Sequence, residues 1–284
     1  MAKPELGKFG VFGHYAQWQQ VPPDQLREIE ALGYGAIWPV GRRPPSSTGW
    51  IPSWARPTSW RWPPASSTSG PPRQAPRRRV VPPHRRGIPE PVPAGHRRRP
   101  PPEAHAEYKK PYDALTEYLD ELDRYGVPPK DRRVVAALGP QVLKLSARRS
   151  AGAHPYLTTP EHTRQARELV GPPDAFIAPE HKAVLTTDAE QARAVGRKAL
   201  EIYLNLANYT NNWKRLGFTD ADVAKPGSDA LVDAVVAHGT VDVVAARLTE
   251  HLTAGADHVP VQVLTGTDKL VPALAELAGP LGLR

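Results

Sequence analysis

The sequence contains no cysteine, a single methionine and no long apolar run. Without cysteine there is neither a disulfide framework nor a thiol nucleophile. No charged-then-apolar leader opens the chain, and no run reaches the roughly 18 apolar residues of a membrane helix. We therefore expect a cytoplasmic protein with no membrane partner. Its 284 residues suffice for one large α/β barrel or two smaller domains.

Basic residues are concentrated in one stretch, residues 41–101. This stretch holds 13 arginines and one acid, Glu90, so it carries +12, which leaves −4 for the other 223 residues of a chain whose net charge is +8. It also holds 16 of the 34 prolines and four of the seven tryptophans, but no lysine and no leucine. Because proline at this density blocks helices and strands, we expect the stretch to be irregular.

Outside that stretch, short apolar strands alternate with amphipathic helices. The first unit has a strand at 9–12, a helix at 24–32 and a strand at 36–38. Cap residues such as Thr159 and Asp188 mark the starts of later helices. The later helices are expected at 112–125, 160–170, 188–206, 228–237, 241–253 and 270–277, and the later strands at 175–185, broken at 179–181, and 259–264, with a polar, aromatic connection at 208–217. This alternation predicts a parallel β/α architecture.

The clearest β/α unit spans residues 132–156. Val134-Val135 indicates a strand that is buried on both faces. Gly139-Pro140 ends this strand and opens a helix, since proline suits the first helical turn. A second strand follows and leads to His154-Pro155-Tyr156. A strand that meets a helix N-terminus through small residues can also bind phosphate, because unpaired N–H groups point outward there; a plain β/α turn is the alternative.

Five stretches resemble one known family, and the resemblance as a whole extends over about three quarters of the chain. They are LGYGAIW at 32–38, PEAHAEYKKPYDALTEYLDELD at 102–123, VVAALGPQVLKLSARRSAGAHPYLTTPEHTRQARELVG at 134–171, LGFTDADVAKPGSDALVDAVVAHG at 216–239 and DVVAARLTEHLTAGADHVPVQVL at 242–264. The family that they resemble is the luciferase-like family of flavin- and deazaflavin-dependent oxidoreductases, in particular its coenzyme F420-dependent branch.

The resemblance implies an α/β fold, the (β/α)8 TIM barrel, formed by residues 1–284 as one domain. It also implies an enzyme that moves hydride between a small organic substrate and a cofactor at the C-terminal mouth of the barrel. That cofactor would be coenzyme F420, with FMN as the alternative. In the family the turn after strand five holds the cofactor phosphate, and here that turn is Ala137-Leu138-Gly139-Pro140. The turn from Gly152 through His154 to Tyr156 would line the same mouth.

Other candidate residues at the mouth have two interpretations each. His14 ends the first strand and is the candidate catalytic proton donor, which would need a pKa near the working pH; a solvated histidine is the alternative. His154 could contact the cofactor or be a hydrogen-bonded loop histidine. Glu180-His181 could be mouth residues or a surface pair. The family often has an acidic residue just before the glycine of this turn, whereas this chain has Ala151. This difference weakens the expectation that the turn from Gly152 to Tyr156 lines the mouth. No metal site is expected.

The family's third and fourth strands fall within residues 41–101. We interpret this stretch as an out-of-frame translation, because tryptophan has one codon and so fixes the bases around it. Residues 59–70 can then be re-read as the apolar strand VAVATGIVNIW, and residues 91–101 as RFLLGIGVGH. Three one-base steps in one direction restore the frame by residue 102. We therefore expect a barrel that is incomplete around strands three and four, and a chain that binds cofactor or folds poorly.

Two further interpretations remain open. The arginine runs 77–79 and 97–99, with the nearby tryptophans, are typical of segments that bind single-stranded nucleic acid. This partner is disfavoured, because the stretch replaces barrel strands and has neither lysine nor RGG spacing. A non-catalytic barrel remnant is the other alternative. A homodimer is compatible with the sequence, which indicates neither the oligomeric state nor the substrate.

Overall fold

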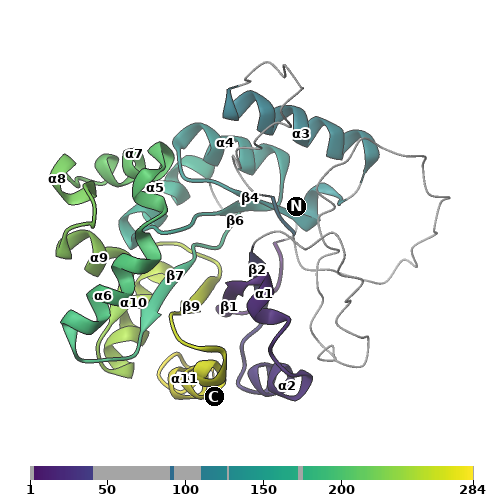
Figure 1. Cartoon of the computed structure of the whole chain (residues 1–284). Helices are drawn as coiled ribbons and strands as arrows, with labels where there is room; N and C mark the ends of the chain where they lie inside the picture. Colours follow the sequence, from purple (N-terminus) through teal and green to yellow (C-terminus); the bar gives the residue numbers. More distant parts are fainter. Residues whose placement is uncertain (1–2, 41–89, 93–109, 127, 172–174, 284) are drawn as a thin grey trace, which may run out of the picture.

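The computed structural model describes residues 3–40, 90–92, 110–126, 128–171 and 175–283. Its strands lie at the centre and its helices around the outside (Figure 1). All seven strand pairings are parallel. This arrangement confirms the expected β/α architecture. No helix in the described part of the chain is both long and apolar enough to cross a membrane.

The described elements follow one another in a regular β/α order. The strands are β1 Phe9–His14, β2 Ile37–Val40, β3 Glu90–Val92, β4 Arg133–Ala136, β5 Gly152–His154, β6 Phe176–Ile177, β7 His181–Val184, β8 Val236–His238 and β9 Val259–Val263. The helices are α1 Tyr15–Trp18, α2 Pro23–Ala31, α3 Pro111–Tyr125, α4 Pro140–Arg149, α5 Pro160–Val170, α6 Ala189–Leu200, α7 Ala207–Arg215, α8 Asp220–Val223, α9 Asp229–Val235, α10 Val241–Thr253 and α11 Thr267–Ala278, with 3-10 turns η2 Lys130–Arg132 and η3 Tyr203–Asn205.

The strands form two sheets, in the orders β2-β1-β9-β7-β8 and β3-β4-β5-β6. Residues 176–184 join them, because β6 and β7 are two parts of one broken strand. On one side the backbone N–H groups of Ala178 and Glu180 continue the pairing with the β5 strand, at 3.0 and 2.9 Å from their acceptors. On the other side Asp257 N–H donates to the Ile177 carbonyl at 2.8 Å, just before β9. The strands therefore form one continuous arc from β3 to β2.

This arc fills seven of the eight positions of a (β/α)8 barrel when β6 and β7 count as one position and β8 is left aside as an edge strand. Within the described residues the barrel is open between β2 and β3. The residues that connect these two strands, 41–89, lie outside the described part of the chain, and so does the re-read strand at 59–70. The prediction that they form no regular structure is therefore untested.

Strand β3 corrects one expectation, because residues 41–101 were predicted to contain no strand as written. Residues 90–92 pair in parallel with β4, with Pro91 opposite Val134. Proline is tolerated at an edge strand because its missing N–H need not donate to a neighbour, and β3 is an edge strand within the described residues. The fourth barrel position is thus occupied by the chain as written, over three residues.

Helix starts follow the capping residues in the sequence. The predicted N-caps Thr159 and Asp188 each accept a hydrogen bond from the backbone N–H three residues further on, and so do Ser228 and Thr240. Such a bond satisfies one of the free donors of the first helical turn. Local sequence therefore determines where these four helices begin.

Three expectations about residues 188–238 are wrong. The first helix ends at Leu200, not near 206. Residues 208–217 are not a connection but lie largely in α7, whose Trp213 is fully buried; this packing outweighs the low helix propensity of its asparagines and threonine. The helix that begins at Asp229 ends at Val235, and residues 236–238 form β8 on the edge of β7 beyond the end of β5.

The interior of the arc is apolar at its centre. Phe12, Trp38, Val134 and Ala178 belong to one buried cluster inside the arc. Their neighbours along each strand instead pack against the helices; these are Val11, Ile37, Val135 and Ile177. Side chains therefore alternate between the interior and the helical layer, as in any strand, and this alternation determines which residues can reach the mouth.

The helical layer contains a buried chain of hydrogen bonds between polar side chains. Thr163 Oγ1 lies 2.8 Å from His251 Nδ1, and His251 Nε2 lies 2.9 Å from His181 Nδ1. Both imidazoles are completely buried. Burial lowers the pKa of His181 to about 3 and the pKa of His251 well below its ordinary value, and it also lowers the pKa of His258, inside the arc, to about 4.

We expect Gly152→Ala to lower the free energy of unfolding by about 1–3 kcal/mol, the usual cost of overpacking. A Cβ at this position would collide with the backbone carbonyl of Phe176 in the paired strand. Urea denaturation measures the change. Gly139→Ala is the matched control, because a Cβ there meets only the Arg215 guanidinium, at 3.8 Å. Equal stability of the two variants would contradict the explanation.

The buried histidines make stability depend on pH. Because their folded pKa values lie below the unfolded value of about 6.5, the unfolded chain binds more protons below that pH. The free energy of unfolding therefore has its full value above about pH 6.5 and falls as the pH decreases towards 4. The decrease is up to roughly 1.4 kcal/mol per pH unit for each histidine. Urea denaturation at several pH values should show a shallower slope for His251→Gln than for the parent chain. An equal midpoint at neutral and acidic pH would disprove this account.

Candidate active site at the carboxyl ends of the strands

Polar side chains gather where the strands of the arc end. Side chains in a strand alternate between its two faces. Each of these polar residues is either two positions after a residue that is buried inside the arc or between two residues that pack against the helices. Each polar side chain therefore faces the interior of the arc. Tyr156 after β5, Glu180 and Lys182 on the broken strand, and Gln262 on β9 meet there, and His14 lies exposed at the end of β1. The interior thus changes from apolar at its centre to polar at the carboxyl ends. We take this end as the candidate active site.

Lys182 is the centre of the polar group. Its Nζ donates to Gln262 Oε1 at 2.6 Å, to the Tyr156 hydroxyl at 2.8 Å and to Glu180 Oε1 at 2.9 Å. These three bonds use all three ammonium protons. The residue is 1% exposed and Glu180 is 0% exposed, so the ion pair is buried. A buried pair of this kind persists only where its geometry and hydrogen bonds offset the loss of water.

The two charges of this pair oppose each other's desolvation. Burial lowers the pKa of Lys182, and the Glu180 carboxylate acts in the opposite direction. Burial raises the pKa of Glu180, and the Lys182 ammonium together with the Leu157 N–H opposes that increase. The Leu157 N–H lies 3.2 Å from Glu180 Oε2. Each partner therefore opposes the shift that burial causes in the pKa of the other.

Leu157 connects this ion pair to the helix that covers the mouth. Its backbone is left-handed, with φ 54°, a conformation that costs energy for a residue other than glycine. Glu180 accepts its N–H, and Trp213 Nε1 donates to its carbonyl at 2.9 Å. These two bonds hold α7 against the end of β5. Strained residues held in this way are typical of functional sites.

Three tyrosines form a wall beside Lys182. The rings of Tyr156 and Tyr203 lie 5.4 Å apart, and those of Tyr203 and Tyr209 lie 4.8 Å apart. All three are partly exposed. Burial raises the pKa of each hydroxyl, so the three remain protonated at neutral pH. The wall thus presents aromatic faces and neutral hydroxyl groups to a ligand.

His154 is almost completely buried and stacks on Trp38, with ring centres 4.8 Å apart and planes at 18°. Its Nδ1 lies 2.7 Å from the Ala178 carbonyl and donates to it, because a carbonyl can only accept. Burial lowers the pKa of His154 to about 4, so the imidazole is neutral at pH 7. The structure thus matches the interpretation of His154 as a hydrogen-bonded histidine, and its contact with a cofactor stays a prediction.

The turn from Ala137 to Pro140 joins β4 to α4 at the same end of the arc. Ala137 N–H donates to the His154 carbonyl at 3.4 Å, and His162 Nε2 donates to the Leu138 carbonyl at 2.9 Å. Gly139 is the N-cap of α4 and has an ordinary φ of −80°. A side chain would fit there, since only Arg215 lies within 4 Å of a Cβ. The fold itself therefore does not require glycine at this position.

Arg215 lies at the end of α7 and is the cation next to this turn. Its Nη2 donates to Asn212 Oδ1 at 3.1 Å and lies 3.8 Å from the position of a Cβ on Gly139. Partial burial lowers the pKa of the guanidinium, which is still charged at neutral pH. A helix N-terminus and a guanidinium thus face the same space, which is the combination that an oxygen anion prefers.

The structure places the other predicted residues as follows. His14 is exposed at the carboxyl end of β1. Gly152 lies at the opposite, amino end of β5, where its lack of a side chain is explained by the close approach of Phe176. Glu180 and His181 are not a surface pair, because both are completely buried and face opposite sides of the strand.

The sequence did not single out Lys182, Gln262, Tyr203 or Arg215. The signal for Lys182 is the alternation in PEHKAVL, where Glu180 and Lys182 share one face of a strand that is otherwise apolar. The other three are brought to the mouth by contacts between elements far apart in the chain. The arginine runs proposed to bind nucleic acid lie outside the described residues.

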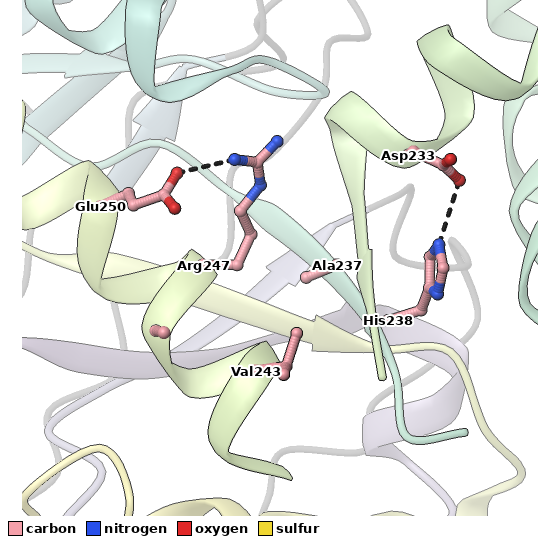
Figure 2. A pocket seen from close by; sticks show the side chains of 7 residues that line it. Asp233, Ala237, His238, Val243, Arg247 and Glu250 are labelled. Atoms are coloured by element: carbon pink, nitrogen blue, oxygen red, sulfur yellow. Dashed lines mark hydrogen bonds and ion pairs between the residues drawn. The ribbon is translucent and has the colours of Figure 1, made fainter. Parts of the chain in front are cut away.

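A separate pocket of about 380 Å³ lies on the outside, between β8 and α10 (Figure 2). Asp233 bonds His238 at 3.0 Å, and Arg247 bonds Glu250 at 2.8 Å. Its charged groups are thus paired with one another and leave little for a ligand. Among the described residues, no three His, Cys, Asp or Glu side chains gather as a metal site.

Comparison with known proteins shows the fold. No family model and no curated protein matches the chain. Among solved structures, an F420-dependent secondary alcohol dehydrogenase in complex with an F420-acetone adduct is similar over 99% of this chain and 99% of its own, with 10% identity and a TM-score of 0.61.

Two other solved structures match shorter parts of the chain. One is the EDTA monooxygenase EmoA from Chelativorans sp. BNC1, with 18% identity over 55% of this chain and 45% of that chain and a TM-score of 0.41. The other is a type II Baeyer-Villiger monooxygenase from Pseudomonas putida in complex with FMN, with 12% identity over 61% and 63% and a TM-score of 0.43. At these TM-scores they add nothing to the fold assignment. The full-length likeness to the alcohol dehydrogenase structure shows that the chain has a parallel α/β fold of the (β/α)8 barrel type, open in its described part.

Proposed function

We propose that the protein is a luciferase-like oxidoreductase that transfers hydride between a small organic substrate and reduced coenzyme F420, with FMN as the alternative cofactor. The observation that carries this proposal is the glycine turn at the start of α4. Gly139 has an ordinary backbone conformation and open space around it, so its small size is explained by a group that approaches the backbone. A phosphate is such a group.

The residues at this turn fit a cofactor phosphate. The first N–H groups of α4 have no partner within the helix, and the Arg215 guanidinium adds a full positive charge beside them. Residues 137–140 and Arg215 would therefore hold the phosphate. The neutral His154 and the tyrosine wall would line the space for the organic part of the ligands. When bound, the deazaflavin supplies the hydride; the protein residues bind, orient and exclude water.

F420 is favoured over FMN by one consideration. The solved structure that is similar over the whole chain is an F420-dependent enzyme, whereas the FMN-containing structure matches at a TM-score below 0.5. A mouth that is occupied by the neutral Tyr156 and by the buried ion pair of Lys182 suits reduction of an uncharged organic substrate.

We further propose that this exact chain is impaired. A closed barrel pairs one more strand between β2 and β3, and residues 41–89, which connect them, contain no apolar run of the kind that a buried parallel strand needs. The out-of-frame interpretation of residues 41–101 gives the reason, because the re-read residues 59–70 form an apolar strand. A missing strand at this position would remove one wall of the interior that the cofactor ring must use.

Thermal stabilisation by F420 tests both parts of this proposal. A chain in which residues 59–70 and 91–101 are replaced by the re-read VAVATGIVNIW and RFLLGIGVGH should be stabilised by about 2.7 kcal/mol at a ligand concentration of 100 Kd. The chain as written should gain much less at the same concentration. Gly139→Val in the re-read chain should remove the gain without lowering the melting temperature of the free protein. Equal stabilisation of both chains would refute impairment, and no binding of F420 or FMN by either would refute the proposed function.

A further inference from the structure

The Tyr156 hydroxyl has surroundings that structural packing alone does not require. It receives the Lys182 ammonium at 2.8 Å, and its two other neighbours, Tyr203 Oη and Gln262 Oε1, both lie at 3.3 Å. The first contact is short and charge-assisted, whereas the other two are long and weak. Because Tyr156 is also partly exposed, a ligand oxygen can replace either weak contact.

Lysine inside a barrel is costly unless it serves a purpose, because several kcal/mol of hydration are lost for each buried ion. Here the ammonium lies against the phenol oxygen and 4.2 Å from the centre of the same ring. An ammonium at this distance stabilises the phenolate more than the phenol. The ammonium therefore offsets part of the increase in the Tyr156 pKa that burial and Glu180 cause, and it can support proton release to a base that appears during a reaction.

We propose that Tyr156 is the catalytic proton donor, that Lys182 is the residue that positions and supports it, and that the substrate is a carbonyl compound. This inference rests on the proposed function. The bound reduced deazaflavin would supply a hydride to the carbonyl carbon, and the electron pair of the C=O π bond would move to the oxygen. The Tyr156 O–H bond then breaks and its proton bonds to that oxygen, so the products are an alcohol, the oxidised deazaflavin and the phenolate.

The phenolate regains its proton from neighbouring groups. Tyr203 lies 3.3 Å away and is partly exposed, so it can relay a proton from solvent. The titratable groups around Tyr156 are Glu180 and Lys182 from the broken strand, Tyr203 from η3 and Tyr209 from α7. The Glu180 carboxylate neutralises the charge of Lys182. Its own negative charge disfavours a phenolate at Tyr156, and the Lys182 ammonium acts in the opposite direction.

This assignment competes with His14. In the arc, β1 lies two positions away from the broken strand that carries Lys182, with β9 between them. His14 and Tyr156 therefore belong to different parts of the mouth. The two candidates can be separated by single substitutions, because neither residue holds a strand in place.

The test is single-turnover oxidation of reduced F420 by simple aliphatic ketones, with protein in excess, in the chain as written and in the re-read chain. F420 fluorescence measures cofactor affinity in parallel. Tyr156→Phe should lower the rate by about 100-fold or more, the usual contribution of a general acid, with F420 affinity unchanged. His14→Gln should lower the rate far less than Tyr156→Phe does. Tyr203→Phe is the control for the removal of a hydroxyl from the same wall and should have a smaller effect.

Lys182 is tested through the pH profile, since removing it alone leaves the Glu180 carboxylate buried and unpaired, which destabilises the fold. The paired variant Glu180→Gln with Lys182→Met removes both charges and should fold. Its rate should fall and the pH profile of the rate should change, whereas a purely structural role would change only the melting temperature. Two results overturn the inference. One is a Tyr156→Phe variant that reacts as fast as its parent. The other is a parent chain that binds F420 but does not oxidise reduced F420 with any of the ketones. Failure of both chains to bind F420 or FMN overturns the proposed function as well.

Discussion

The structure depends on the broken strand at residues 176–184. Its first part pairs with β5 and its second part with β9, so it holds the two sheets together as one arc. The break at Pro179 and Glu180 also allows the strand to serve two neighbours of different lengths, since β8 takes over the edge that β5 leaves. The same segment carries both members of the buried ion pair. The continuity of the fold and the chemistry of the mouth therefore have one origin.

The buried ion pair sets the character of the mouth. Glu180 and Lys182 cancel each other's charge, so a ligand meets neutral hydroxyl groups and not a net charge. The pair also reaches outward, because Glu180 holds the left-handed Leu157 and Leu157 in turn holds Trp213. Through this chain of bonds the mouth positions α7, and α7 brings Arg215 to the glycine turn. One set of contacts thus links the polar group around Lys182 to the glycine turn beside Arg215.

Local signals in the sequence predict local structure well. Thr159 and Asp188 cap the helices that they were expected to cap, because an N-cap acts on N–H groups only three residues away. Residues 208–217 were predicted incorrectly, since the buried Trp213 that stabilises α7 finds its partner Leu157 56 positions earlier. Lys182 escaped prediction for a similar reason. A lysine in a strand is typical of a solvated edge, and only its three distant acceptors reveal that it is buried.

The described strands leave one place of the barrel between β2 and β3. The residues between these strands in the chain are 41–89, which lie outside the described part. That stretch is the one whose composition departs from the rest, with arginine and proline in place of leucine and lysine. A strand in that place would be buried between two parallel neighbours and would need a run of apolar β-branched residues. The sequence as written has no such run there, whereas the re-read residues 59–70 do, and this difference in composition is the ground for the out-of-frame interpretation.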